Sequence, residues 1–334
     1  MPQPELDFRN VNSLWGSMIV ETLACMGVRK AVVSPGSRSA PLAFAVSRHH
    51  GIEAIPILDE RSAAFFALGL ARQDLRPVLL VCTSGTAGAN YFPAIIEAQE
   101  SGVPILVLTA DRPPEMRFCA SGQTIDQQGM FGRHVNWFCA SGQTIDQQGM
   151  FGRHVNFFHE LALPETSDGL LRYLRQTIAH ACTRTCLPYP GPVHLNVPFR
   201  DPLPPIPDRT AETLGGLDWE DFFAHIAPSQ GVEPLTRAPA IPSDVHGVIV
   251  AGPALPRDPA AYAASVGEIA RKLGWPVLAD GLSPARNYAR EIPHLVTAYD
   301  AILRNPEVAG KLKPETVICL GGWPTSKILR NWLE

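Results

Sequence analysis

The sequence predicts an α/β fold built on a parallel sheet, followed by a second, incomplete α/β domain. Short apolar runs typical of buried strands alternate with segments whose apolar residues recur at helical spacing. In the first third of the chain, each of four such strands ends in a polar or glycine-containing loop. Because strand–helix–strand connections are right-handed crossovers between parallel strands, we expect all four loops to lie on one edge of the sheet.

The first domain is expected to span residues 1–200. Its strands are the apolar runs at residues 31–33, 52–58, 77–82, 104–109 and 192–197. A first helix begins after Asn10 or Asn12, either of which can cap it, and ends at Gly27. Further helices are expected over residues 90–100 and 168–185.

Prolines crowd residues 201–243, which we expect to link two domains and to carry one short helix near 219–226. The α/β pattern then resumes over residues 244–334. Its expected strands lie at residues 247–251, 276–279 and 316–320, and its expected helix spans residues 259–273. We expect this second domain to be incomplete, and a helix is expected to begin near Thr325.

Composition excludes several classes of function. The 334 residues are 46% hydrophobic and 18% charged, with a net charge of -4 and no basic stripe, so nucleic acid is not an expected partner. No apolar run approaches the roughly 20 residues of a membrane span. The polar N-terminus is unlike a signal peptide, so we expect a cytoplasmic protein without membrane attachment. The seven cysteines form no C-x-x-C pair and are expected to be reduced, buried thiols.

Residues 118–137 and 138–157 are the same sequence except at the last position, which is Trp137 in one copy and Phe157 in the other. Two copies are too few for a solenoid. Such identity indicates a recent tandem duplication or an error in the sequence. A surface loop tolerates such an insertion because closure entropy grows slowly with loop length, but a loop lining a site need not.

Glu60 is the first candidate site residue, because it follows the strand at residues 52–58 and opens a helix. The alanine-rich segment from Ser62 to Leu70 is too apolar for a surface helix, so we expect water-poor surroundings that raise the pKa of the Glu60 carboxyl. A glutamate in such a place can exchange protons near neutrality. The alternative is that Asp59 and Glu60 only stabilise the start of the helix.

Two arginines stand at neighbouring strand ends. Arg38 lies in the loop from Ser34 to Ser39, whose last residue can cap the helix that begins near Ala40. Arg112 follows the strand that ends near residue 109. Two guanidinium groups and a carboxyl group suit an anionic, carboxylate-bearing ligand. The glycine-containing loop at 83–88 matches neither the dinucleotide fingerprint nor the P-loop, so alone it indicates only a turn.

Six blocks resemble, in the same order, those of a known enzyme family. They are Ser-Pro-Gly-Ser-Arg-Ser at 34–39, Asp-Glu-Arg-Ser-Ala at 59–63, Thr-Ser-Gly-Thr-Ala at 83–87, Ala-Asp-Arg-Pro-Pro-Glu at 110–115, Gln-x-Ile-Asp-Gln at 123–127, and Gly-Pro-Val-His-Leu-Asn-Val-Pro at 191–198. The chain resembles the MenD family of thiamine-diphosphate-dependent synthases, which serve menaquinone and phylloquinone biosynthesis. The resemblance implies a pyrimidine-binding domain followed by part of the family's middle domain.

The resemblance also implies an activity. Members decarboxylate 2-oxoglutarate on thiamine diphosphate and add the remaining carbon unit to isochorismate. Glu60 would be the catalytic residue and would hydrogen-bond the aminopyrimidine ring of the cofactor. The positions that match substrate-binding residues of the family are Ser37, Arg38, Arg112, Gln123 or its copy Gln143, and Lys327. Those that match its cofactor-binding residues are Glu60, Thr83, Ser84, Gly85 and Asn90.

The sequence departs from the family pattern in two places. Either Gln123 or Gln143 could enter the site, but both cannot occupy one position, and each follows a glycine where the family usually has asparagine. The diphosphate-binding domain, expected to carry the ligands of Mg²⁺ or Mn²⁺, is absent from these residues. Ala279-Asp280-Gly281 is expected to be a strand-end turn rather than a metal site. This chain alone is therefore expected to be inactive.

In the complete enzyme, the family arrangement would place the cofactor between subunits of a homodimer or a dimer of dimers. Two alternatives stay open. The chain could belong to another thiamine-diphosphate-dependent 2-oxo acid decarboxylase or synthase, which would share Glu60 but not the two arginine blocks. It could also be a non-catalytic binding module or fragment.

Overall fold

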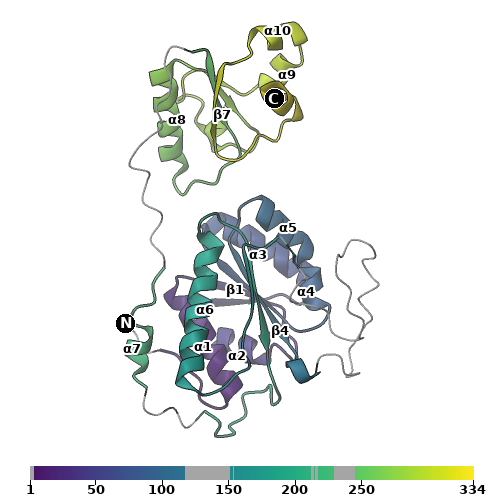
Figure 1. Cartoon of the computed structure of the whole chain (residues 1–334), viewed down its shortest axis with the longest axis vertical. Helices are drawn as coiled ribbons and strands as arrows, with labels where there is room; N and C mark the ends of the chain where they lie inside the picture. Colours follow the sequence, from purple (N-terminus) through teal and green to yellow (C-terminus); the bar gives the residue numbers. More distant parts are fainter. Residues whose placement is uncertain (1–3, 117–150, 153, 212–213, 215–216, 229–244) are drawn as a thin grey trace. The chain divides into compact units, whose positions relative to one another are not determined.

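The computed structural model describes residues 4–116, 151–152, 154–211, 214, 217–228 and 245–334. The chain divides into two compact units, Met1–Gly231 and Val232–Glu334. This division falls within the proline-rich segment 201–243. Figure 1 shows that each unit has its own sheet and its own helices.

The first unit contains a six-stranded sheet in the order β2-β1-β3-β4-β6-β5. All of its paired neighbours are parallel, as the sequence predicts. Its strands are β1 (Lys30–Val33), β2 (Glu53–Pro56), β3 (Val78–Cys82), β4 (Ile105–Asp111), β5 (Phe157–Glu160) and β6 (Val193–Pro198). The edge strand β5 was not predicted.

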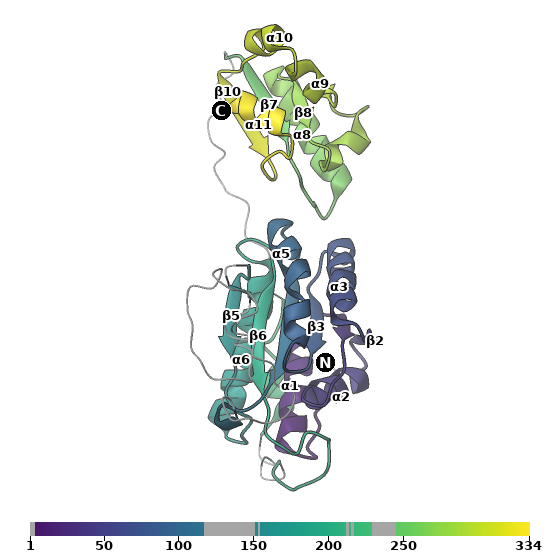
Figure 2. The same ribbon diagram turned by 90° about the vertical axis from the view of Figure 1, so that its right-hand side faces the viewer.

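Helices cover both faces of this sheet, as Figures 1 and 2 show. They are α1 (Val11–Cys25), α2 (Ala40–Arg48), α3 (Glu60–Asp74), α4 (Ala87–Asn90), α5 (Phe92–Glu100), α6 (Asp168–Cys186) and α7 (Trp219–Phe223). Residues on alternate sides of β4 enter different cores: Leu106 packs with α1, α2 and α6, whereas Val107 packs with α3 and α5. Central strands buried on both faces explain the continuous apolar runs in the sequence.

Two asparagines near the start of α1 have different roles. The Asn10 side chain accepts a hydrogen bond from the Ser13 amide and caps the helix. The Asn12 side chain instead donates to the carbonyls of Arg200 and Pro202. The proposed cap of α2 is wrong, because the Ser39 hydroxyl bonds to the Gly36 backbone and closes its own loop.

The expected burial around residues 52–70 is also wrong. Strand β2 is an exposed edge strand, shorter than the predicted run 52–58. Helix α3 buries only an alanine stripe, while Phe65 and Phe66 are 43% and 45% exposed. The physical reason is the position of β2 at the edge of the sheet, which leaves one side of α3 without a neighbour among the residues that the structure describes.

The proline-rich segment packs on the first unit before the division at Gly231. Leu203, Phe222 and Phe223 are buried in the same core as α1 and α6. Helix α7 forms where a short helix was expected, and the Asp218 side chain caps it by accepting from the Asp221 amide. The first unit therefore extends past residue 200 in three dimensions.

The second unit has a four-stranded parallel sheet in the order β10-β7-β8-β9. Its strands are β7 (Gly247–Ala251), β8 (Val277–Ala279), β9 (Leu295–Val296) and β10 (Thr316–Leu320). Its helices are α8 (Pro259–Leu273), α9 (Tyr299–Leu303), α10 (Pro306–Lys311) and α11 (Lys327–Leu333). Cys319 lies exposed on the edge strand β10, so the expectation of buried thiols fails there.

Candidate functional site

The candidate site lies at the carboxyl ends of the first unit's strands. The sheet starts from the neighbouring strands β1 and β3: β2 is added beside β1 on one side, and β4 is added beside β3 on the other. The strand order therefore reverses between β1 and β3. Parallel sheets bind ligands at the carboxyl edge where the order reverses. The loops that follow β1 and β3 flank this position, and they carry Ser37 and Arg38 on one side and Thr83, Ser84 and Gly85 on the other.

These two loops touch. A Cβ atom placed on Gly36 would lie 2.5 Å from the Thr83 Cβ, so only glycine fits this close approach. The Ser34 hydroxyl donates to the Ile57 carbonyl over 2.9 Å, which joins the end of β1 to the connection between β2 and α3. Gly85 has a φ of +84°, a left-handed conformation that favours glycine. The edge is thus tied together by loop-to-loop contacts.

Glu60 is the first residue of α3 and is half-buried. Its neighbour Asp59 caps the helix, since the Asp59 carboxylate accepts from the Ser62 amide over 2.7 Å. The Glu60 side chain has no hydrogen-bond partner among the described residues. Burial raises the pKa of the Cys82 thiol, and the charge of the Glu60 carboxylate raises it further. Glu60 therefore lies near the end of β3, and capping does not occupy its carboxyl group.

Arg112 joins the ends of β4 and β3. Its guanidinium donates to the Ser84 hydroxyl over 3.1 Å, and its backbone amide donates to the Asp111 carboxylate over 2.7 Å. The residue is only 8% exposed. Such a guanidinium has little rotamer freedom left to lose when it binds a ligand.

Arg38 is held by the segment that follows β6. Its Nη1 atom donates to the Phe199 carbonyl over 3.0 Å and lies 3.6 Å from the Asp201 carboxylate. Arg38 and Arg112 thus belong to the same strand edge as Glu60, as the sequence predicts. Ser37, in the same loop as Arg38, is exposed.

Other predicted site residues are not brought together here. The Asn90 side chain donates to the Thr86 carbonyl one turn earlier in the chain. Lys327 is exposed in the second unit, where it opens α11. Gln123 and Gln143 lie outside the described residues, as does most of the duplicated segment.

The donor set fits one part of the cofactor that the sequence implies. A carboxyl group without an internal partner suits the ring nitrogen of an aminopyrimidine, and the two guanidinium groups suit carboxylates. Among the described residues, no group of three or more His, Cys, Asp or Glu side chains could hold a metal ion. Asp280 makes the expected strand-end turn, since its carboxylate accepts from the Leu282 amide and its carbonyl accepts from the Ser283 amide. The carboxylate also accepts from the Thr325 amide and hydroxyl.

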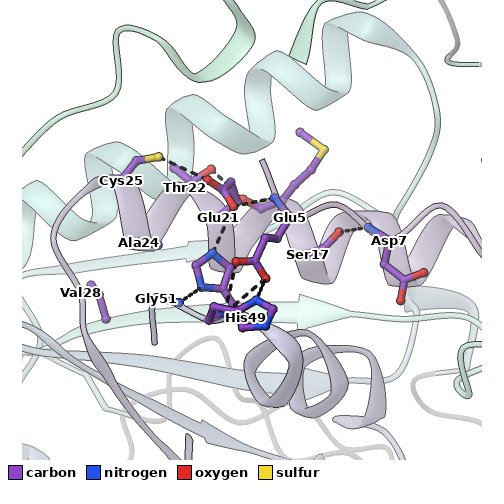
Figure 3. Close-up of polar contacts among 12 residues, drawn as sticks. Glu5, Asp7, Ser17, Glu21, Thr22, Ala24, Cys25, Val28, His49 and Gly51 are labelled. Atoms are coloured by element: carbon purple, nitrogen blue, oxygen red, sulfur yellow. Dashed lines mark hydrogen bonds and ion pairs between the residues drawn. The ribbon is translucent and has the colours of Figure 1, made fainter. Parts of the chain in front are cut away.

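A second polar cluster lies at the opposite, amino edge of the sheet (Figure 3). The Glu21 carboxylate contacts His49 Nε2 over 3.1 Å and accepts from the Glu5 amide. The Gly51 amide donates to His49 Nδ1 over 3.0 Å, which fixes the orientation of the ring. This cluster ties α1 to the end of α2 and is not part of the candidate site.

Sequence reasoning missed a buried polar group beside Arg112. Thr109 and Asp111 on β4 and His194 and Asn196 on β6 are all nearly inaccessible to solvent. The signal was available in the block at 191–198, where two polar residues alternate with apolar ones in a buried strand. In the part of the chain that the structure describes, no helix is long and apolar enough to cross a membrane.

Comparisons with known proteins agree with this architecture. Residues 15–130 match the family model of the thiamine pyrophosphate enzyme N-terminal TPP binding domain, and residues 240–334 match that of the middle domain of thiamine pyrophosphate enzymes. A solved structure from Mycobacterium smegmatis, described as a thiamin diphosphate-dependent enzyme, covers 80% of this chain and 44% of its own. Its TM-score is 0.50 at 19% identity, which supports the fold alone.

Curated relatives are much more similar in sequence. The 2-succinyl-5-enolpyruvyl-6-hydroxy-3-cyclohexene-1-carboxylate synthase of Acaryochloris marina is 51% identical over 98% of this chain, and that of Nostoc sp. is 50% identical over the same share. In both comparisons the chain spans 54% of the relative, about half its length. The chain therefore belongs to the thiamine pyrophosphate enzyme family, and its sequence relatives there are 2-succinyl-5-enolpyruvyl-6-hydroxy-3-cyclohexene-1-carboxylate synthases.

Proposed function

We propose that this chain forms the pyrimidine-binding part of a 2-succinyl-5-enolpyruvyl-6-hydroxy-3-cyclohexene-1-carboxylate synthase. The complete enzyme would join the carbon unit left by decarboxylation of 2-oxoglutarate to isochorismate. The observation that carries the proposal is the half-buried Glu60 carboxyl group, which has no partner among the described residues at an edge that also carries Arg38 and Arg112. The names of the curated relatives support it.

In this proposal the residues of the chain have separate tasks. When bound, thiamine diphosphate supplies the carbon nucleophile and the electron sink for decarboxylation. Glu60 holds a proton at its carboxyl group and exchanges it with the aminopyrimidine ring. Arg38 and Arg112 bind and orient substrate carboxylates, with Ser37 and one of the duplicated glutamines beside them. Thr83, Ser84, Gly85 and Asn90 contact the cofactor.

The metal and the rest of the cofactor site are proposed to come from outside this chain. The relatives are about twice as long, and we propose that their additional length carries the ligands of Mg²⁺ or Mn²⁺. Lys327 is proposed to reach the substrate from the middle domain. The edge in the first unit would then supply only the pyrimidine half of the site.

We further propose that a second subunit covers this region. Leu58 is 83% exposed beside Glu60, and Phe65 and Phe66 are exposed on the following helix. Large exposed apolar side chains mark interaction sites. A homodimer, alone or paired into a tetramer, would bury them and exclude water from Glu60. Light scattering of the full-length protein is expected to give an even-numbered oligomer, and a monomer with full activity would contradict this arrangement.

The test of the proposed function uses the full-length protein and product formation from 2-oxoglutarate and isochorismate. Glu60→Gln is expected to lower turnover by about 10²–10⁴-fold, the usual size of a general acid–base contribution. Glu53→Gln is the matched control, because Glu53 is exposed at the amino end of β2, and this variant should keep full activity. Normal turnover by Glu60→Gln would refute the role of Glu60.

The choice of substrates is tested separately. Replacement of isochorismate by other acceptors distinguishes this synthase from other thiamine-diphosphate-dependent decarboxylases. Efficient product formation with an unrelated acceptor, and none with isochorismate, would refute the proposed substrate. A full-length protein that fails to bind thiamine diphosphate in calorimetry would favour a non-catalytic binding module.

A further inference from the structure

Asn196 lies at the centre of a buried polar cluster that spans three adjacent strands. The parallel register places Thr109 of β4 and Glu160 of β5 directly beside Asn196 of β6. Thr109 and Asn196 are both inaccessible to solvent. On the same face of β4, the preceding positions Ile105 and Val107 are apolar core residues. On β4, polar residues thus replace the apolar pattern from Thr109 onward.

The Asn196 amide is oriented by its neighbours. Its Nδ2 atom donates to Asp111 Oδ2 over 2.9 Å and to Glu160 Oε2 over 3.0 Å. Its Oδ1 atom accepts from the Thr109 hydroxyl over 3.0 Å. In this orientation the amide nitrogen faces the two carboxyl groups and the amide oxygen faces the hydroxyl, so each of the three contacts pairs a donor with an acceptor. One amide group therefore holds two carboxylates.

His194 completes this arrangement from the same strand. Its Nε2 atom lies 2.7 Å from the Thr109 hydroxyl, whose own proton is donated to Asn196. The ring nitrogen must therefore be the donor. Burial lowers the pKa of His194 to about 3, so the ring is neutral at physiological pH. The donor order from His194 through Thr109 to Asn196 is fixed.

The cluster reaches Arg112 through Asp111. One oxygen of the Asp111 carboxylate accepts from Asn196, and the other accepts from the Arg112 backbone amide over 2.7 Å. The Arg112 guanidinium then extends to Ser84 on the neighbouring loop. Asp111 is the last residue of β4, and its carboxylate binds the backbone amide of the residue that follows the strand. A shift of Asp111 would move the backbone of Arg112.

We propose that Asn196 is a positioning residue, which fixes the Asp111 carboxylate and through it the Arg112 guanidinium for a substrate carboxylate. The inference rests on the proposed substrate-binding role of Arg112. It assigns a role to the block at 191–198, whose polar residues have none in the proposed function. Buried polar groups that serve stability alone can be replaced by well-packed apolar residues. Val107, two positions before Thr109 on the same face of β4, is such an apolar core residue.

The test is a double-mutant cycle in the full-length protein, with KM for each substrate and kcat as readouts. Asn196→Leu keeps the approximate volume and removes the amide, and it is expected to raise KM for one substrate about tenfold with kcat changed less than twofold. In an Arg112→Ala background, the same substitution should change KM less than twofold. Additive effects on KM in the two backgrounds would overturn the proposal.

Thr109→Val also disturbs the orientation of the Asn196 amide, but it changes the side chain less. This variant tests the positioning role of Asn196 if Asn196→Leu does not fold. Loss of the hydroxyl frees the Asn196 amide, and KM for the same substrate should rise about threefold or more. Thr22→Val is the matched control, because Thr22 is equally buried but bonds only within α1. Equal KM values for these two threonine variants would overturn the proposal.

The outcomes separate this inference from the proposed function. If Arg112→Ala leaves KM for both substrates unchanged, the substrate-binding role of Arg112 fails, and the role of Asn196 fails with it. If Arg112→Ala raises KM but Asn196→Leu and Thr109→Val do not, only the positioning role of Asn196 is overturned.

Discussion

Gly36→Ala should displace the loop that carries Arg38. The new Cβ would lie 2.5 Å from the Thr83 Cβ and 2.7 Å from its Cγ2, about 1 Å closer than the 3.5–4.0 Å of ordinary carbon contacts. One of the two loops must therefore move by about 1 Å. Overpacking of this kind costs about 1–3 kcal/mol. For a unit of this size that corresponds to a fall in Tm of about 2–12 °C.

The functional effect of Gly36→Ala should exceed its effect on stability. A displacement of about 1 Å at a positioned group can lower the rate by about 10²-fold. The assay is kcat/KM of the full-length protein, together with the Tm of its first unfolding transition. Gly169→Ala is the matched control, because a Cβ there meets nothing within 4 Å and α6 gains a better helix former.

A compensating change makes the reasoning refutable. Thr83→Gly removes the atoms that the new methyl group would meet, so the double variant Gly36→Ala, Thr83→Gly should recover part of the lost Tm. If Gly36→Ala has the same Tm and kcat/KM as the parent protein, the two loops do not touch as described.

Three further predictions concern the framework of the two units. Asn10→Ala should destabilise the first unit by about 2–3 kcal/mol in denaturant titration, because it removes the cap of α1 and two hydrogen bonds to the carbonyls of Pro204 and Ile206; an effect below about 0.5 kcal/mol would contradict it. Burial raises the pKa of Glu21, but hydrogen bonds from His49 and from the Glu5 amide outweigh this, and the net pKa is lowered from 4.5. The stability that ionised Glu21 contributes is therefore present above pH 4.5 and is lost as the pH falls through its lower pKa in the folded protein. Between pH 4.5 and that pKa, the free energy of unfolding of Glu21→Gln should therefore fall less than that of the parent protein. Equal falls in the two proteins would refute the role of Glu21. Asp280→Asn should destabilise the second unit by about 2 kcal/mol, because the new amide cannot accept from both the Leu282 and Thr325 backbones; unchanged unfolding of that unit would contradict this.

Much of the architecture could be predicted because central parallel strands are buried on both faces. Their apolar runs stand out, and the strand Gly247–Ala251 and the helix Pro259–Leu273 have the predicted bounds. The carboxyl-edge position of Glu60 follows from the same alternation of strands and helices. The exposure of β2 could not be predicted, because a strand's place in the sheet order depends on pairing between distant segments.

The hydrogen-bond partners of the site residues could not be predicted from the sequence either. Arg38 is held by Phe199, whose carbonyl is 161 residues away in sequence. Asn196 meets Glu160 through the register of a strand that was not predicted. The segment from Leu203 to Phe223 has the prolines of a linker, yet Leu203, Phe222 and Phe223 are buried in the core. Side chains spaced so irregularly give no periodic signal.

The most direct test of the central claim is a structure of the full-length protein with thiamine diphosphate bound. The account predicts that the Glu60 carboxyl group lies within hydrogen-bond distance, roughly 2.6–3.2 Å, of a nitrogen of the aminopyrimidine ring. It also predicts Arg38 and Arg112 on the same side of the cofactor. An aminopyrimidine ring bound elsewhere, with Glu60 facing solvent, would contradict the account.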